Sequence, residues 1–487
     1  MDNSSKLSKK RLVTAVAAAT LSLSLSSMAE DFDSMAKGEN GYEVSAPLLT
    51  IGETIDDYTP VGILDGLGAM ELNGDTVRVF ANHELLHFRG NEYTVNYGNL
   101  TMTGARVSFF DIDKDTREIV DAGLAYHTVY DAFGNVPTNT DFLGGLDGFS
   151  RFCSSILVEA NQFAKGSGNG NGEKNGRARG LQNPIYFTGE EDGGFFNPVG
   201  GAEWALDVAT GELWQVPAMG RGAWENITQI DTGNNKTVAF ILADDSSPFD
   251  FDGDNEKEVA PLFLYVGTKD KKGDFLGRNG LRDGKLYVWV SDTGETLPSQ
   301  FNTTGELDGS WVEIDNERRP ELAQPDRKAS DFDRTGYDEN GYPTQGNLWL
   351  QAKDIGAFGF SSPEDVSTNP DKPNAAVLAS TGVDNFDIDP MTGNGVDTFG
   401  TMYVIETDFD TMTAELEIIY DGDADPSRAL RSPDNLDWGD DGYIYIQEDK
   451  AEDVPASGDE FLFGTRQEVD DVLTDCDPNG LSGPLCA

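Results

Sequence analysis

The sequence predicts an all-β fold, and within that class a β-propeller, from three observations. Short runs of β-branched and aromatic residues recur along the chain and end in an acidic residue, glycine-containing turn signals separate them, and helical periodicity is scarce. The chain has 487 residues, 55 of them glycine, and no Pro/Ser-rich linker divides it. That length exceeds a single β-sandwich, whereas a propeller grows by adding four-stranded blades around a central channel.

The predicted strands are, in order, "VRVFANHE" (77–84), "PIYFTGEED" (184–192), "LFLYVGTKD" (262–270), "KLYVWVSD" (285–292), "TMYVIETD" (401–408) and "YIYIQED" (443–449). Between such runs lie the turn signals "ATGE" (209–212), "DTGE" (292–295), "MTGN" (391–394) and "GDDG" (439–442). The alternation of apolar and polar residues in these runs is typical of strands with one buried face, and the Gly-containing tetrapeptides favour tight turns. Blade boundaries do not follow from this pattern, because the repeats are irregular.

The first 29 residues have the pattern of a secretory signal. A basic stretch that ends at Arg11 precedes an apolar and small-residue run from Leu12 to Leu25, and Ser27 and Ala29 offer the small residues of a cleavage site. Residues 30–487 are therefore expected to form one exported propeller domain, through the general secretory or the twin-arginine route. Within it, the Gly/Asn-rich stretch 164–180 is expected to be a flexible surface insertion, and residues 476–487 a tail.

The chain is strongly acidic, with a formal net charge of -51. Such a charge repels nucleic acid and anionic membranes, so neither is expected as a stable partner. Yet 38% of the residues are hydrophobic and 10% aromatic, which is enough for a folded core. Two interpretations of the acidic excess remain open: a solvated surface suited to a salty exterior, or carboxylates gathered around divalent cations.

The chain contains three cysteines. Cys476 and Cys486 lie in the tail "CDPNGLSGPLC", where a disulfide is predicted for an exported protein. Cys153, in "GFSRFCSSILVEA", is then left unpaired. It is either a small buried thiol or a thiolate that binds a metal.

Residues 83–87 read His-Glu-Leu-Leu-His, a literal HExxH in a chain with three histidines. In metalloproteases this spacing works because a helix places both imidazoles on one face. Here His83 ends a strand-like run and Gly90 follows His87 closely, so there is hardly room for that helix. We therefore favour a reading in which Glu84 ends a propeller strand as a metal-ligand candidate and His87 is structural.

Acidic residues end several other predicted strands, and strand ends in a propeller converge on one axis. Together these carboxylates are predicted to form an oxygen-rich cage for Ca²⁺ or Fe³⁺. The candidates are Glu190, Glu191, Asp244, Asp245, Glu364, Asp365, Asp434 and Glu448.

Two further acidic loops resemble calcium loops without completing an EF-hand. The first, 250–258, offers Asp250, Asp252 and Asp254 for a peripheral Ca²⁺, and the second, 111–118, is expected to be a hairpin turn. No G-x-S-x-G elbow and no P-loop occur in the sequence. The chemistry that remains is metal-assisted hydrolysis of a phosphoryl group.

Several motifs occur in an order that resembles the PhoX-like alkaline phosphatases. They are "ANHE", "RFCSS", "FTGEE", "ILADD" before "LFLYVGTK", "GFSSPEDV" and "RSPDNL", across residues 79–437. The resemblance implies a secreted six-bladed β-propeller that hydrolyses phosphate monoesters at iron and calcium ions on its axis. It also implies a monomer that acts on small phosphoesters.

The resemblance carries a ligand set onto this sequence: Glu84, Cys153, Glu190, Glu191, Asp244, Asp245, Glu364, Asp434 and Asn435. This chain departs from the family at several points: Ser154 and Ser155 follow the cysteine where a Gly pair is usual, and the loop from there to Glu190 is long. The twin-arginine signal is imperfect, and Ser362 stands where an arginine tends to precede the Pro-Glu motif. Arg431 and Arg151 are the substitute candidates for a phosphate-binding arginine. Two alternatives to a monoesterase stay open: a phosphodiesterase or phytase-like propeller, and a non-enzymatic propeller stabilised by calcium.

Overall fold

The computed structural model describes residues 47–163, 179–193, 197–245, 248, 258–301, 305–325, 334–382, 397–424 and 430–448. The elements named below lie in one compact unit, residues 51–487. The predicted signal 1–29, most of the insertion 164–180, the loop acids Asp250, Asp252 and Asp254, and the cysteines Cys476 and Cys486 lie outside the described residues.

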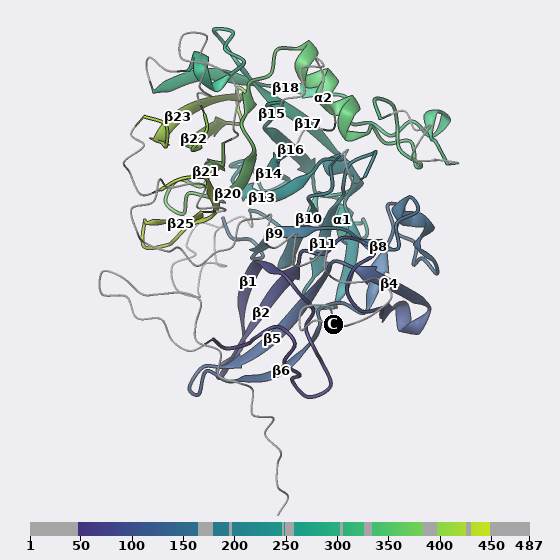
Figure 1. Ribbon diagram of the computed structural model, residues 1–487. Helices are drawn as coiled ribbons and strands as arrows, with labels where there is room; N and C mark the ends of the chain where they lie inside the picture. Colours follow the sequence, from purple (N-terminus) through teal and green to yellow (C-terminus); the bar gives the residue numbers. More distant parts are fainter. Residues whose placement is uncertain are drawn as a thin grey trace, which may run out of the picture. The chain divides into compact units, whose positions relative to one another are not determined.

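Strands dominate the described chain and form consecutive antiparallel sheets (Figure 1). The first sheet contains β1 (Leu64–Asn73), β2 (Thr76–His83), β5 (Arg106–Asp113) and β6 (Ile119–Leu124). The second contains β9 (Phe152–Val158), β10 (Ile185–Glu190), β11 (Glu203–Asp207) and β12 (Glu212–Gln215), with β7 (Thr128–Tyr130) parallel to β12 at its edge.

The third sheet contains β13 (Trp224–Ile230), β14 (Thr237–Asp244), β16 (Phe263–Thr268) and β17 (Gly284–Ser291). The fourth contains β20 (Pro363–Thr368), β21 (Ala375–Ser380), β22 (Thr401–Asp408) and β23 (Thr413–Asp421). Strand β18 (Glu306–Ile314) pairs with β17 on one side and β23 on the other, so these two sheets are continuous. The fifth contains β24 (Pro433–Trp438) and β25 (Ile444–Glu448).

The remaining elements are short. They are β3 (Tyr93–Val95), β4 (Leu100–Gly104), β8 (Gly148–Phe149), β15 (Ala260–Pro261), β19 (Gly359–Phe360), α1 (Phe275–Asn279) and α2 (Gln345–Asp354). None of the helices within the described residues is long and apolar enough to cross a membrane.

The sheets are arranged as the blades of a propeller. The first strand of each sheet contacts the first strand of the next, in the order β1, β9, β13, β20, β24. The hydrophobic clusters lie between consecutive sheets rather than within one sheet. The prediction of an all-β propeller is therefore confirmed, with five such sheets in the described part of the chain.

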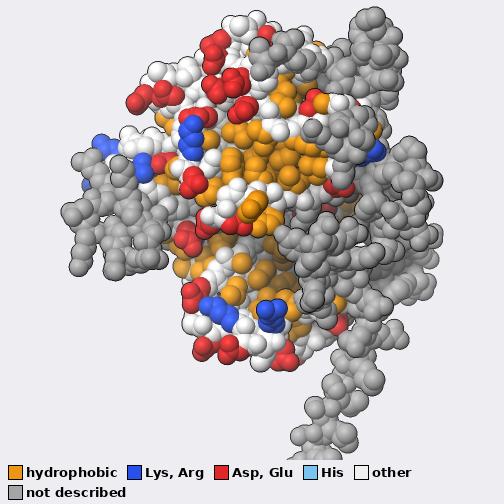
Figure 2. Space-filling view, turned by 90° about the vertical axis from the view of Figure 1, so that its left-hand side faces the viewer, with side chains coloured by type: hydrophobic (Ala, Val, Ile, Leu, Met, Phe, Trp, Pro, Cys, Tyr) orange, Lys and Arg blue, Asp and Glu red, His pale blue; other side chains and the backbone are white. Residues whose placement is uncertain are grey.

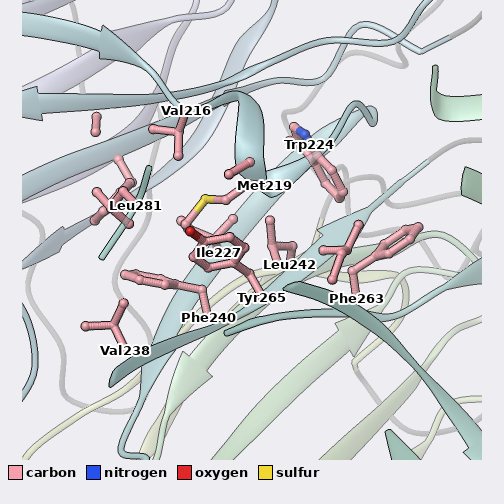
Figure 3. Packing of buried hydrophobic residues seen from close by; sticks show 14 of the residues in the cluster. Val216, Met219, Trp224, Ile227, Val238, Phe240, Leu242, Phe263, Tyr265 and Leu281 are labelled. Atoms are coloured by element: carbon pink, nitrogen blue, oxygen red, sulfur yellow. The ribbon is translucent and has the colours of Figure 1, made fainter. Parts of the chain in front are cut away.

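The core between the second and third sheets shows why these strands pack (Figure 3). The β14 run "TVAFILAD" is almost wholly buried because both of its faces meet apolar neighbours. Phe240 and Leu242 pack in this cluster with Trp224 of β13, whose side chain is fully buried. Burying one such large side chain stabilises the fold by about 1.5–3 kcal/mol.

Three of the four predicted turn signals fall between strands, and "MTGN" (391–394) lies outside the described residues. "ATGE" joins β11 to β12 with Gly211 at φ 68°, and "GDDG" joins β24 to β25 with Gly442 at φ 85°. Glycine adopts these left-handed conformations without the steric cost that a Cβ would add. The loop in 111–118 is the predicted hairpin turn, in which Asp113 Oδ1 accepts hydrogen bonds from the amides of Asp115 and Thr116.

The surface is less uniformly polar than the net charge alone would imply. Figure 2 shows a face on which apolar side chains form broad areas and acidic side chains lie around them. Leu67 and Tyr443 are among the large apolar residues that are exposed. Some acidic side chains therefore lie on this surface, and others, such as Glu225 and Asp244, are buried.

Candidate metal centre

A one-residue β-bulge recurs at the start of the first strand in all five sheets. In each case the first strand advances by three residues between two paired positions, while the second strand advances by two. The paired steps are Leu64–Leu67 against His83–Ala81, Phe152–Ser155 against Glu190–Thr188, Trp224–Ile227 against Asp244–Leu242, Pro363–Val366 against Ser380–Leu378, and Pro433–Leu436 against Glu448–Ile446. A bulge re-aims the side chains that it contains, and such bulges are common beside active sites.

The first residue of each bulge is a metal-binding type. These residues are Asp65, Cys153, Glu225, Glu364 and Asp434, the second residue of β1, β9, β13, β20 and β24 respectively. Because the five strands contact one another in this order, these residues stand at equivalent positions on neighbouring strands.

These side chains converge into three groups whose ligand atoms lie within 4.8 Å of one another. We call them the triads: Asp65–Glu84–Cys153, Cys153–Glu191–Glu225 and Glu225–Glu364–Asp434. Cys153 is shared by the first two triads and Glu225 by the last two. The triads therefore form one continuous site that crosses the five sheets.

In β13 and β20 the second residue of the bulge links neighbouring first strands. Asn226 donates from Nδ2 to Asp365 Oδ1, and Asp365 Oδ2 accepts from the amide of Leu436 at 2.8 Å. These bonds link β13 to β20 and β20 to β24. Asn435 occupies the same second position in β24.

Two pairs of adjacent acidic residues, Glu190–Glu191 and Asp244–Asp245, stand at the ends of second strands. The two members of each pair have different roles. Glu190 and Asp244 end β10 and β14, and their carboxylates accept hydrogen bonds from the protein. Glu190 accepts from the amides of Ser150 and Ala202, and Asp244 from the amide of Ala223. Asp244 also accepts from Gln345 Nε2 and Trp349 Nε1, at 2.8 and 2.6 Å.

The neighbouring acids face the site instead. Glu191 belongs to the second triad, and the charge of Asp245 acts on both Glu191 and Glu364. Of the predicted ligands, the structure therefore brings together Glu84, Cys153, Glu191, Glu364 and Asp434, with Asp245 nearby. It uses Glu190 and Asp244 as hydrogen-bonded supports of the strand ends.

Arg151 contacts one carboxylate from each of the first two triads. Its Nη2 is 3.1 Å from Glu84 Oε1 and also pairs with Glu191 Oε2. Its Nε donates to the backbone oxygen of Glu191 at 3.1 Å. Burial works to lower the pKa of Arg151, but the carboxylates of Glu191 and Glu84 outweigh it and raise that pKa.

Arg431, the other predicted phosphate-binding residue, lies in a different setting. Its guanidinium is over the ring of Phe399, 4.6 Å from the ring centroid. Its amide donates to the Glu448 carboxylate at the end of β25, and its side chain is partly buried. Arg431 precedes Asp434, a member of the third triad, by three residues in the sequence.

The HExxH residues do not form a zinc site. His83 is fully buried at the end of β2, where its Nδ1 lies 2.7 Å from Val61 O and its Nε2 lies 2.6 Å from Ser108 Oγ. His87 Nδ1 accepts from the amide of Asp147 at 3.2 Å. No helix contains residues 83–87, so the expectation of a strand end at Glu84 is confirmed.

Burial and mutual repulsion raise the pKa values of three carboxyl groups in this site. Burial is the largest cause for Glu191, whose pKa rises to about 8, with Asp245 and Glu84 adding to the rise and Arg151 opposing it. The pKa values of Glu225 and Glu364 are raised by burial and by neighbouring carboxylates. The Cys153 thiol is affected in the same way, first by burial and then by Asp65 and Glu225.

The residues present fit metal ions. Glu225 Oε1 is buried without a hydrogen-bond partner, and an orphaned carboxylate oxygen at the junction of two triads is a vacant ligand for a cation. Carboxylate oxygens are the ligands that Ca²⁺ prefers, whereas a thiolate favours a transition metal such as iron. Bound cations also relieve the carboxylate repulsion that raises these pKa values.

Two members of the triads were not predicted from the sequence: Asp65 and Glu225. The prediction considered acids that end strands, whereas these two stand at the second position of a first strand. Antiparallel pairing places the start of β13 opposite the end of β14, so both positions belong to the same end of the sheet. The signal was present in "ILDG" and "AWEN", which precede strand-like runs.

The family model for alkaline phosphatase PhoX matches residues 212–479. A comparison with curated proteins returns no relative at a significant level.

Two solved structures are similar at low sequence identity. PhoX of Pseudomonas fluorescens, in complex with the transition-state analogue vanadate, has a TM-score of 0.48 and 14% identity, covering 80% of this chain and 74% of its own. A protein of Bacteroides fragilis provisionally described as a 6-phosphogluconolactonase has a TM-score of 0.23 and 12% identity, covering 77% and 89%.

Proposed function

Because the chain belongs to the PhoX family of alkaline phosphatases, whose model matches more than half of it, we propose that this phosphatase is an exported, metal-dependent phosphomonoesterase. The observation that supports this proposal is the continuous row of triads from Asp65 to Asp434. Phosphoryl transfer depends more on neutralising charge than on covalent chemistry, and a carboxylate-lined metal centre provides that neutralisation.

We assign the cations by the chemistry of the donor sets. The oxygen-only triad Glu225–Glu364–Asp434 suits Ca²⁺, and the two triads that share Cys153 suit iron as Fe³⁺. When bound, these ions supply Lewis-acid polarisation of a phosphoryl oxygen. Asp245 and Asn435 lie beside the triads and are proposed as further oxygen ligands.

The chain's own residues bind and orient the substrate around that centre. Arg431, three residues before Asp434 in the sequence, is proposed to contact the phosphate group, since a guanidinium matches phosphate oxygens bidentately. Small-molecule phosphoesters are the substrates that fit an acidic protein, because only cations in the site attract the phosphate. The N-terminal pattern 1–29 supports export to the periplasm or the extracellular space.

The test combines metal content with turnover. We expect purified protein to contain calcium and iron by elemental analysis, to absorb visible light through a thiolate-ligated ferric ion, and to hydrolyse para-nitrophenyl phosphate. Cys153→Ala should lose iron, colour and activity together. Ser154→Ala is the matched control, because Ser154 is the next residue of the same bulge and belongs to no triad.

Three outcomes would contradict the proposal. Full monoesterase activity of exhaustively metal-free protein would exclude a metal-dependent mechanism. Hydrolysis of bis-para-nitrophenyl phosphate in preference to the monoester would favour a phosphodiesterase, and rapid release of phosphate from phytate a phytase-like enzyme. Calcium without iron, and no turnover of any phosphoester, would indicate a non-enzymatic propeller.

A further inference from the structure

Three sheets share a backbone feature immediately before the bulge. Arg151, Ser362 and Ser432 each stand two residues before the first bulge residue, and they adopt φ values of 47°, 53° and 46°. Residues other than glycine rarely adopt this left-handed conformation, so its recurrence marks three equivalent positions around the site. Two of these positions carry a serine and one carries an arginine.

The arginine is held in place by its neighbours on both sides. The amide of Arg151 donates to Leu85 O at 2.8 Å, and the amide of Glu191 donates to Arg151 O at 2.9 Å. The Arg151 Nε bond to Glu191 O adds a third fixed point. The side chain is only 12% exposed, so solvent does not screen its charge as it does for a surface arginine.

This fixed guanidinium lies between two carboxylates from different triads. Glu84 belongs to the first triad and Glu191 to the second, and Nη2 of Arg151 contacts both. Two carboxylates brought close together in a buried site repel each other unless a cation lies between them. Between Glu84 and Glu191 this cation is the guanidinium of Arg151.

We infer that Arg151 is a built-in cation of the metal centre, which takes the place of one bound ion and positions Glu84 and Glu191. This inference rests on the proposed metal centre. It makes the site asymmetric, because the chain supplies one positive charge between Glu84 and Glu191, whereas the orphaned Glu225 oxygen has no such partner and is left for a bound ion.

The test is the number of cations that each variant holds. Wild type, Arg151→Gln and Arg151→Lys are dialysed against saturating Ca²⁺ and their metal content per chain is measured. We expect Arg151→Gln to bind about one more divalent cation than wild type, because the pair Glu84 and Glu191 becomes a vacant site. Arg151→Lys, which keeps the charge, should retain the wild-type number.

An ion pair outside the triads that involves a single carboxylate provides the control. Arg78, 23% exposed in its side chain, pairs with Asp111 at 2.7 Å. Arg78→Gln should destabilise the protein without changing the number of bound cations. An increase in this variant equal to that in Arg151→Gln would overturn the inference, because the effect would then follow from any lost ion pair.

The remaining outcomes are equally decisive. An unchanged or smaller metal content in folded Arg151→Gln overturns the inference, and folding of this variant only when Ca²⁺ is present supports it. An unfolded variant at saturating Ca²⁺ also overturns it, because no cation then replaces the guanidinium. Failure of the proposed function is a separate result, since wild type itself would then bind no metal.

Discussion

Cys153 is the side chain at which the first two triads meet. Its Sγ is 3.1 Å from Asp65 Oδ2, and it lies in the second triad with Glu191 and Glu225. A thiol in this position has a raised pKa as long as only carboxylates surround it, first because it is buried. A metal ion reverses this balance, since a coordinating thiol is deprotonated by the charge of the ion.

Glu225→Gln tests the junction of the last two triads. We expect it to lose bound metal and to lower kcat/KM by at least about 100-fold, since even residues that only support a ligand contribute 10–100-fold. In metal-free protein the same change should raise Tm, because it removes a buried carboxylate whose pKa is raised by burial and by Glu191. Metal content and Tm are the measurements.

Glu203→Gln is the matched control for that variant. Glu203 is also a buried carboxylate with oxygens that lack hydrogen-bond partners, but it belongs to no triad within the described residues. It should raise Tm in metal-free protein as Glu225→Gln does, while metal content and activity stay at the wild-type level. Equal metal loss in both variants would refute a specific role for Glu225.

At the residue scale, sequence reasoning identified Glu84, Cys153, Glu191, Glu364 and Asp434, all of which the structure brings to the triads. Within each pair of adjacent acids, it did not distinguish the residue that faces the site from the residue that accepts hydrogen bonds from the protein. That distinction depends on which way a side chain points at a strand end, and a one-residue bulge reverses the alternation that a sequence pattern assumes.

At the scale of elements, the bulged first strands do two jobs with adjacent residues. The first bulge residue faces the metal centre, and in β13 and β20 the second bonds the neighbouring first strand. Asp365 shows the second role most clearly, because it accepts from Asn226 of β13, from its neighbour Val366, and from Leu436 of β24. Burial raises the pKa of Asp365 to about 7, with these hydrogen bonds opposing the rise.

Asp365→Ala should therefore separate three first strands at once. We expect a loss of about 2–4 kcal/mol in the free energy of unfolding, because the buried amides of Val366 and Leu436 and the Asn226 side chain lose their acceptor. Urea denaturation of calcium-loaded protein measures it. Asp440→Ala, at an exposed turn between β24 and β25, is the control and should change stability by less than about 0.5 kcal/mol.

The sequence predicted elements better than their connections. Each of the six predicted strands corresponds to an observed strand, from β2 to β25. Strand β18, which joins the third and fourth sheets, was not predicted. Its run "ELDGSWVEI" has a glycine and several acids, and its pairing with β23 across a long stretch of sequence is a tertiary contact that local propensity does not encode.

The many acidic residues make the stability of the metal-free protein depend on pH. Burial and carboxylate repulsion raise the pKa of Glu191 to about 8, and burial raises those of Asp244 and Asp365 to about 7. In the unfolded chain such groups titrate near their ordinary values of about 4. Between about pH 4 and about pH 8, the folded metal-free protein therefore binds more protons than the unfolded chain.

It follows that metal-free protein should lose stability as the pH rises from about 4 to about 8, since folding then opposes ionisation of these acids. Bound cations favour the ionised carboxylates and should flatten this dependence. Urea midpoints measured between pH 5 and pH 8.5, with chelator or with saturating Ca²⁺, test both statements. A metal-free protein that is more stable at pH 8.5 than at pH 5 would contradict the first.

The continuity of the third and fourth sheets through β18 gives the metal centre unequal stiffness. Glu225 and Glu364 sit on a single nine-stranded sheet, so the spacing between them is set by a framework that resists deformation. Asp434 sits on β24, which pairs with β25 alone in the described chain. An ion of a different radius would therefore be accommodated by displacement of Asp434, and exchange of calcium for a larger or smaller cation should strain the fifth sheet first.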